Sequence, residues 1–151
     1  MPPIFNILLS LGLTSLLSTT VLAGQTLNVI FASEDFTTTS GSGDEIDHNR
    51  GGFAITNSDG VELYGNRMPG NDVSCYRDKG GRTFKLMSNC FSAPRTFHCQ
   101  VGEAVEPYTC EVSTDAGGTV GEATGDDHSC RLSFDLDEDE SCDENADWQV
   151  I

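Results

Sequence analysis

Basic residues are scarce in this 151-residue sequence: eight lysines and arginines stand against 24 aspartates and glutamates, a formal net charge of −16 at pH 7. A surface with this charge repels the phosphates of nucleic acids and the headgroups of anionic lipids. We therefore expect no nucleic-acid partner. The overall charge favours a basic protein as the partner. Seven of the eight bases lie between residues 50 and 95, the only segment that could receive phosphate.

Several signatures of enzymes and metal sites are also missing. The sequence has no C-x-x-C pair, which argues against zinc, and no G-x-S-x-G motif, which argues against a hydrolase serine. No N-x-[ST] sequon occurs, so N-glycosylation is not expected. We expect no cofactor.

Charged side chains are absent from residues 1–23. Residues 4–17 are mostly apolar, a length typical of the hydrophobic region of a signal peptide, and the cleavage-like tripeptide Val21-Leu22-Ala23 follows. This pattern predicts cleavage before Gly24, an extracellular location, and one secreted domain over residues 24–151. An uncleaved membrane anchor is the alternative for the apolar run. No later segment is apolar enough to span a membrane.

All six cysteines lie after the predicted signal peptide. An even count in an exported protein implies a disulfide framework. We predict nearest-neighbour pairing: Cys75–Cys90, Cys99–Cys110 and Cys130–Cys142. The middle pair has a geometric basis, because a hairpin centred between Ala104 and Val105 would place Cys99 directly opposite Cys110.

Apolar and polar residues alternate with period two along most of the chain, and helical periodicity is nearly absent. Nine short strands are predicted, at residues 27–32, 53–56, 61–64, 73–77, 82–87, 96–101, 108–112, 130–136 and 148–150. Short strands separated by Gly, Asn, Asp and Pro predict an all-β domain, an antiparallel sandwich or barrel, with a Greek key possible. Residues 37–43 and 114–129 are predicted to be flexible loops.

Eight carboxylates crowd into residues 135–147. Clustered carboxylate oxygens suit hard cations, but an EF-hand loop starting at Asp135 would have Glu140 where the turn requires glycine. We predict a solvated acidic loop held by Cys142, without a metal site. The candidates for weak cation binding, the alternative, are Asp135, Asp137 and Asp139.

Four residues with catalytic side chains occur in the order His48, Glu62, Arg77 and His98. Such a set could supply a general base, a general acid and a positive charge for phosphate, as RNA cleavage requires. In residue type and order it resembles the secreted fungal guanyl-specific ribonucleases, whose sequence motifs do not surround these positions. A ribonuclease-type hydrolase is therefore an alternative function, and the sequence assigns no catalytic residue.

Two aromatic residues five positions apart, Phe31 and Phe36, follow an apolar run, and residues 61–64 are followed by Gly70. This spacing resembles the Greek-key motif of the βγ-crystallins, although Thr38 stands where that motif has glycine. The resemblance implies a structural module as a further alternative.

The plan of the whole chain resembles the small cysteine-rich secreted proteins of plant-associated fungi. It shares with them a signal peptide, a short secreted domain, six cysteines and no catalytic signature. The resemblance implies an effector-like or toxin-like protein that binds an extracellular or host molecule, and it assigns no residue a role. We predict this non-enzymatic function, with an extracellular or host protein as the partner.

Overall fold

The structure is a computed structural model that describes residues 24–67, 75, 81–101, 108–126 and 128–151. The predicted signal peptide lies outside the described residues. Within them, no helix is long and apolar enough to cross a membrane.

Eleven strands are present in the described part of the chain. They are β1 (Thr26–Ala32), β2 (Phe36–Thr39), β3 (Glu45–His48), β4 (Gly52–Asn57), β5 (Glu62–Asn66), β6 (Arg82–Ser88), β7 (Arg95–Val101), β8 (Tyr108–Thr114), β9 (Thr119–Thr124), β10 (Ser129–Asp135) and β11 (Trp148–Val150). They form a four-stranded sheet in the order β10-β1-β4-β5, a five-stranded sheet in the order β11-β6-β7-β8-β9, and the hairpin β2-β3. All of their ladders are antiparallel.

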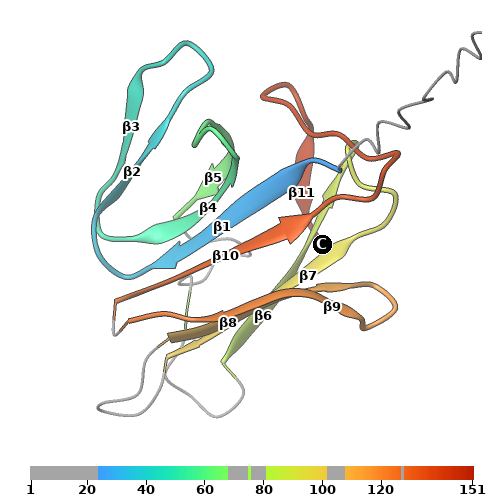
Figure 1. Ribbon diagram of the computed structural model, residues 1–151. Helices are drawn as coiled ribbons and strands as arrows, with labels where there is room; N and C mark the ends of the chain where they lie inside the picture. The colour runs from blue at the N-terminus through green and yellow to red at the C-terminus, as the bar shows by residue number, and fades with distance from the viewer. Residues whose placement is uncertain (1–23, 68–74, 76–80, 102–107, 127) are drawn as a thin grey trace, which may run out of the picture.

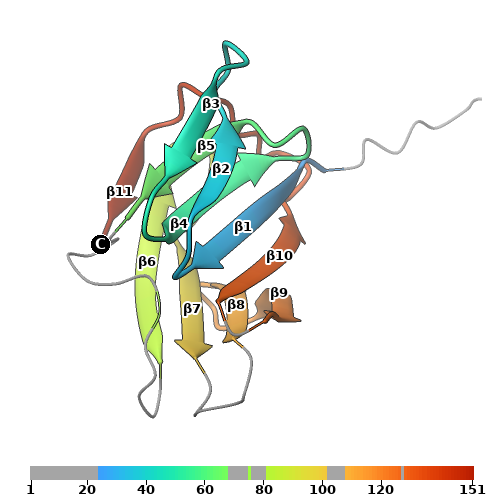
Figure 2. The ribbon, with the colours of Figure 1, turned by 90° about the vertical axis from the view of Figure 1, so that its left-hand side faces the viewer.

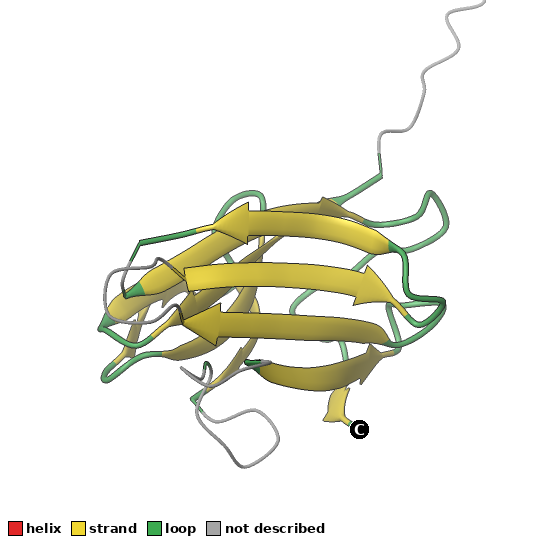
Figure 3. Cartoon of the chain, turned by 90° about the horizontal axis from the view of Figure 1, so that it is seen from below, coloured by secondary structure: helices red, strands yellow, loops and turns green. Residues whose placement is uncertain are grey.

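The two large sheets face each other as the layers of a sandwich (Figure 1), and Figure 3 shows the layers from below. This confirms the predicted antiparallel all-β fold and identifies it as a sandwich, since the sheets do not close into a barrel. At one side, β9 of the five-stranded sheet lies close to β10 of the four-stranded sheet. The approach is so close that a Cβ atom added at Gly121 would lie only 2.8 Å from the carbonyl oxygen of Ser133.

The core lies between the sheets and is built from the apolar side of each alternating strand. At its centre Phe53 of β4 lies 5.0 Å from both Phe31 and Phe84 and 5.3 Å from Phe97, measured between ring centroids. All four rings are buried. Successive side chains in a strand point to opposite faces of its sheet. The polar side chains that alternate with the core residues therefore lie on the outer face of each sheet.

Eight of the nine predicted strands overlap strands of the structure. The remaining one, residues 73–77, lies outside the described residues apart from Cys75, which is not in a strand. The two predicted flexible loops are corrected, because residues 37–43 contribute to the hairpin β2-β3 and residues 114–129 contain β9. Both were missed because they lack an alternating apolar pattern. The face of β9 away from the core is largely exposed.

The hairpin β2-β3 folds over the outer face of the four-stranded sheet (Figure 2). Its Phe36 packs with Ile30, Ala32 and Ala54, a second buried apolar cluster separate from the sandwich core. The hairpin therefore covers one part of an outer sheet face and leaves the neighbouring part open.

The disulfide prediction is wrong: the bonds are Cys75–Cys99, Cys90–Cys142 and Cys110–Cys130. The predicted register is confirmed, since Cys99 is indeed opposite Cys110. Both of these side chains face the interior, however, where Cys130 of the facing sheet is available to Cys110. Nearest-neighbour reasoning considered only pairing along the chain and missed this bond between the sheets.

Peptide mapping of the unreduced protein should recover these three bonds. Trypsin alone leaves Cys99, Cys110 and Cys130 on one peptide, because no lysine or arginine separates them. Cleavage after glutamate at positions 103, 106, 111 and 122 separates all three. A peptide that joins Cys99 to Cys110 would contradict the structure.

Candidate functional site

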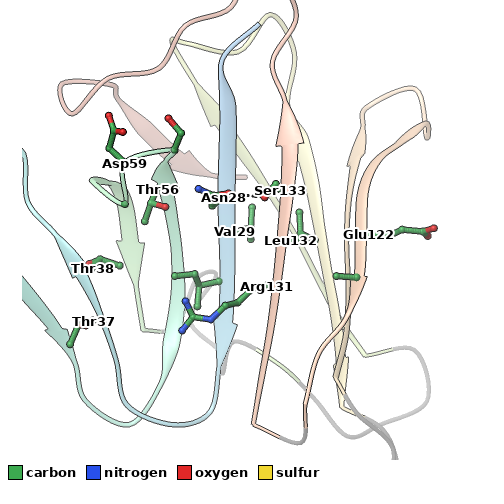
Figure 4. A pocket seen from close by; sticks show the side chains of 14 residues that line it. Asn28, Val29, Thr37, Thr38, Thr56, Asp59, Glu122, Arg131, Leu132 and Ser133 are labelled. Carbon is green, nitrogen blue, oxygen red and sulfur yellow. Dashed lines mark hydrogen bonds between the residues drawn. The ribbon is translucent and has the colours of Figure 1, made fainter. Parts of the chain in front are cut away.

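An open groove of about 660 Å³ runs over the outer face of the four-stranded sheet, beside the hairpin β2-β3 (Figure 4). Its lining residues come from β1, β2, β4, β9, β10 and the β4-β5 turn. They are Asn28, Val29, Ile30, Thr37, Thr38, Thr56, Ser58, Asp59, Gly60, Glu122, Ala123, Arg131, Leu132 and Ser133. Six of the fourteen residues have a hydroxyl or an amide side chain, two are acids, and Arg131 is the one base in this lining.

The floor of the groove follows from strand register. Asn28 of β1 pairs with Ser133 of β10 on one side and with Thr56 of β4 on the other, so three polar residues form a row across three strands. Within the row, Ser133 Oγ donates to Asn28 Oδ1 at 2.7 Å, and Asn28 Nδ2 donates to the carbonyl oxygen of Asn57 at 3.0 Å. In the next outer row, Arg131 pairs with Ile30. These bonds fix Asn28 and Ser133 as a rigid polar floor.

Two polar groups of this floor have no partner within the described residues. Thr56 is only 4% exposed, yet its hydroxyl makes no hydrogen bond, and it lines the groove. The exposed guanidinium of Arg131 makes no ion pair or hydrogen bond. Figure 4 shows it reaching from β10 across β1. Polar groups in concave sites are commonly satisfied by a ligand.

The β4-β5 turn forms the upper rim. Asn57 Oδ1 accepts hydrogen bonds from the backbone N–H of Asp59 and of Val61, both at 2.9 Å, and Gly60 adopts the positive φ of +82° that the turn needs. The turn joins β4 to β5. It holds Ser58 and Asp59 at the edge of the groove.

Beside the groove, two of the predicted candidate residues come together. His48 Nε2 of β3 lies 2.6 Å from Glu62 Oε2 of β5, and Thr38 Oγ1 of β2 donates to the same oxygen at 2.5 Å. A register shift between Ile55 and Thr56 places Glu62 opposite Thr56, on the outer face of the sheet. Such irregularities re-aim a side chain. Both side chains of the His48–Glu62 pair are nearly buried, at 12% and 13% exposure.

These contacts fasten the hairpin to the sheet. The ring of His48 stacks on Phe36 at 4.3 Å, and the N–H of Thr39 donates to the carbonyl oxygen of Gly60 at 3.2 Å. Gly65 leaves room for the Glu62 carboxylate, since a Cβ there would lie 2.1 Å from its Oε1. Thr38 bonds to Glu62 and also lines the groove. The cluster of Thr38, His48 and Glu62 therefore positions the side of the groove that the hairpin forms.

Replacing Glu62 by alanine should loosen the hairpin without unfolding the sandwich. The change removes the acceptor that Thr38 and His48 share and leaves these nearly buried side chains only each other, with Thr38 Oγ1 at 3.2 Å from His48 Nε2. An unsatisfied buried group costs about 1–3 kcal/mol. Amide exchange should accelerate in β2 and β3 and stay unchanged in β1 and β10. Equal acceleration in all four strands would show that the cluster supports the whole fold instead.

The other two candidate residues do not join this pair. His98 lies on β7 of the other sheet, between the inward-facing Phe97 and Cys99, and its Nδ1 lies 2.9 Å from Thr83 Oγ1. The sandwich core therefore separates His98 from His48 and Glu62. Arg77 lies outside the described residues.

The acidic segment is more closely tied to the fold than the sequence suggests. Glu140 is buried against Arg95, with Nη2 to Oε2 at 2.8 Å and Nη2 to Oε1 at 3.0 Å. Asp135 accepts a hydrogen bond from Thr26 at 2.6 Å, and Asp137 lies 3.5 Å from Arg95. Across the described residues, no group of three or more His, Cys, Asp or Glu side chains is arranged to hold a metal ion.

No protein-family model matches the chain, and comparisons with curated proteins and with solved structures find no match either. These comparisons therefore support neither the crystallin resemblance nor the effector resemblance. The function has to be argued from the geometry of the groove.

Sequence reasoning missed the groove. It considered two histidines, Glu62 and Arg77, whereas six of the fourteen groove residues are Asn, Ser or Thr and the one base there is Arg131. A signal was present in the polar positions of three strands, Asn28, Thr56 and Ser133, which all point outward. Finding the groove would have required the strand order, which the sequence does not give.

Proposed function

We propose that this is an exported, effector-like or toxin-like protein that binds an extracellular or host molecule in the groove, without chemistry. The observation that carries the proposal is the open groove of about 660 Å³ in which Thr56 and Arg131 have no partner among the described residues. Ligand sites in proteins commonly have volumes of about 300–1,000 Å³ and a few placed polar groups.

Rigidity supports the same proposal. The groove floor lies on three hydrogen-bonded strands, and the Cys110–Cys130 bond ties β10 to the facing sheet. A preformed site loses little conformational entropy when a ligand binds. A small sandwich with this floor therefore suits recognition.

Blocking the groove should abolish binding of the partner. Ser133 is exposed on the outer face of β10, so Ser133→Tyr would place a ring in the groove, and Thr109→Tyr is the matched control on the outer face of the other sheet. The oxidised wild-type protein is used to capture partners from the medium into which it is secreted. We expect Ser133→Tyr to weaken capture at least about tenfold, a loss of about 1.4 kcal/mol, while Thr109→Tyr retains it. Equal capture by wild type and Ser133→Tyr would contradict the proposal.

Outside the groove, the net charge of −16 favours a basic surface on the partner. Charge-assisted association has an on-rate that falls as salt rises. The same capture at two salt concentrations tests this, and a salt-insensitive on-rate would remove the electrostatic part of the proposal.

A ribonuclease-type hydrolase is the second candidate, and the observation in its favour is the close His48–Glu62 pair. Against it stand the place of His98 on the other sheet and the use of Glu62 as the acceptor for Thr38. We expect the purified oxidised protein not to cleave RNA. Cleavage that is lost in Glu62→Ala or His98→Ala would favour the hydrolase over the binding protein.

A further inference from the structure

We propose that the groove selects a sugar acid, a ligand with one carboxylate among hydroxyl groups. The carboxylate would pair with Arg131 and the hydroxyls with Thr56 and Asp59. This inference rests on the proposed function, since it specifies the ligand class of the same groove.

Arg131 provides the site for the carboxylate. Its guanidinium is exposed, lies over the floor beside β1 and has no ion pair within the described chain (Figure 4). A guanidinium is planar and matches a carboxylate with two parallel hydrogen bonds, which gives both energy and orientation. The neighbouring acid Glu122 points away from Arg131 in Figure 4, so the positive charge is not neutralised there.

Thr56 provides a hydrogen-bonding site for a neutral hydroxyl. The residue is 4% exposed, its hydroxyl is unpartnered, and Figure 4 shows the oxygen directed toward β1, over the floor. The oxygen is not among the fully buried polar atoms that lack a partner, so it can be reached from the groove and can exchange water for a ligand hydroxyl. Because a hydroxyl both donates and accepts, a sugar hydroxyl can satisfy it in either direction.

Asp59 and Ser58 extend this hydroxyl recognition at the rim. The Asp59 carboxylate makes no hydrogen bond or ion pair within the described residues, and as an acceptor it can take hydrogen bonds from ligand hydroxyls. The same carboxylate, together with the net charge of −16, repels a ligand with many negative charges. The chemistry therefore favours a ligand with a single carboxylate and excludes polyanions.

Amide-shift titrations of the isotope-labelled, oxidised protein test this inference with D-glucuronate as the probe. Its methyl ester lacks the charge, D-glucose lacks the carboxyl group, and acetate lacks the hydroxyls. We expect glucuronate to shift the amides of Asn28, Thr56 and Arg131, and each of the other three probes to bind at least about tenfold more weakly.

Variants locate the interaction. Arg131→Gln should raise the Kd for glucuronate at least about tenfold, and Thr56→Val should raise it several-fold, whereas Arg67→Gln should leave it unchanged. Arg67→Gln is the matched control, because it removes one positive charge, as Arg131→Gln does, from an exposed residue outside the groove. An unchanged Kd in Arg131→Gln would overturn the inference.

Two further results would also overturn it: equal binding of glucuronate and its ester, or no shift in the groove with glucuronate. The proposed function is judged separately, by partner capture with Ser133→Tyr. If that variant loses capture while glucuronate does not bind, the groove is the binding site and only the ligand class is wrong. If it keeps capture, the groove itself is not the site.

Discussion

Replacing Glu140 by glutamine should lower the free energy of unfolding by about 3–5 kcal/mol, although Glu140 lies in a segment crowded with acids. The side chains of Glu140 and Arg95 are 2% and 5% exposed, and they form a hydrogen-bonded ion pair. Glutamine would leave the buried charge of Arg95 without its buried partner, and the remaining carboxylate, Asp137 at 3.5 Å, is 70% exposed. A domain of this size has about 5–15 kcal/mol of total stability, so the loss is large.

The same residue should make stability depend on pH. Burial by itself raises the pKa of Glu140, but hydrogen bonds from the hydroxyl and N–H of Ser92 and the N–H of Asp137, with the Arg95 charge, outweigh it, so the pKa lies below its ordinary value of 4.5. A carboxyl whose folded pKa is lowered contributes stability that is present above its unfolded pKa and is lost as pH falls through the folded pKa. The wild type should therefore lose stability as pH falls below about 4.5, and Glu140→Gln should lack this part of the loss.

Urea unfolding at neutral and acidic pH measures both effects. Asp139→Asn is the matched control, because it removes one carboxylate charge from an exposed neighbour. It should change stability by less than about 0.5 kcal/mol. Equal stability of Glu140→Gln and Asp139→Asn would mean that the ion pair contributes nothing measurable.

Replacing Phe53 by alanine should cost about 3–5 kcal/mol, because it removes the central ring of the core. Phe53 is fully buried, and it touches rings from both sheets, including Phe31 on its own sheet and Phe84 and Phe97 on the facing one. The small residue would leave a cavity that rigid strands on either side fill poorly.

Phe53→Leu is the control, since it retains most of the apolar volume and should cost clearly less than alanine. Chemical unfolding of the two variants and the wild type gives the comparison. A loss below about 1 kcal/mol in Phe53→Ala would show that the sandwich core can collapse around the deletion.

The sandwich could be predicted because its core strands carry a strong alternating pattern. Leu27, Val29 and Phe31 in β1 are all fully buried, and the hairpin at residues 57–60 follows from its polar turn with Asp-Gly. The hairpin β2-β3 could not be predicted in this way, because its buried apolar residue, Phe36, packs on the outside of a sheet. Strands are predicted from alternating apolar residues that face the sandwich core, and β2 and β3 do not face that core.

Only part of the candidate site could be predicted from the sequence, because the rest depends on which strands are neighbours. His48 and Glu62 were singled out by residue type, and the structure does bring them together. The groove residues Thr56 and Arg131 have ordinary side chains whose meaning depends on which strands are neighbours. Likewise Glu140 looked like one more solvated acid, and only its approach to Arg95, 45 residues earlier in the chain, shows otherwise.

We propose that the protein binds its partner through the groove on the outer face of β10, β1 and β4. Hydrogen exchange of the oxidised protein with and without the captured partner tests this claim most directly. We expect added protection in the groove strands and in the turn at residues 57–60, with none at residues 135–147. Protection confined to residues 135–147, or to the outer face of β7 and β8, would contradict it.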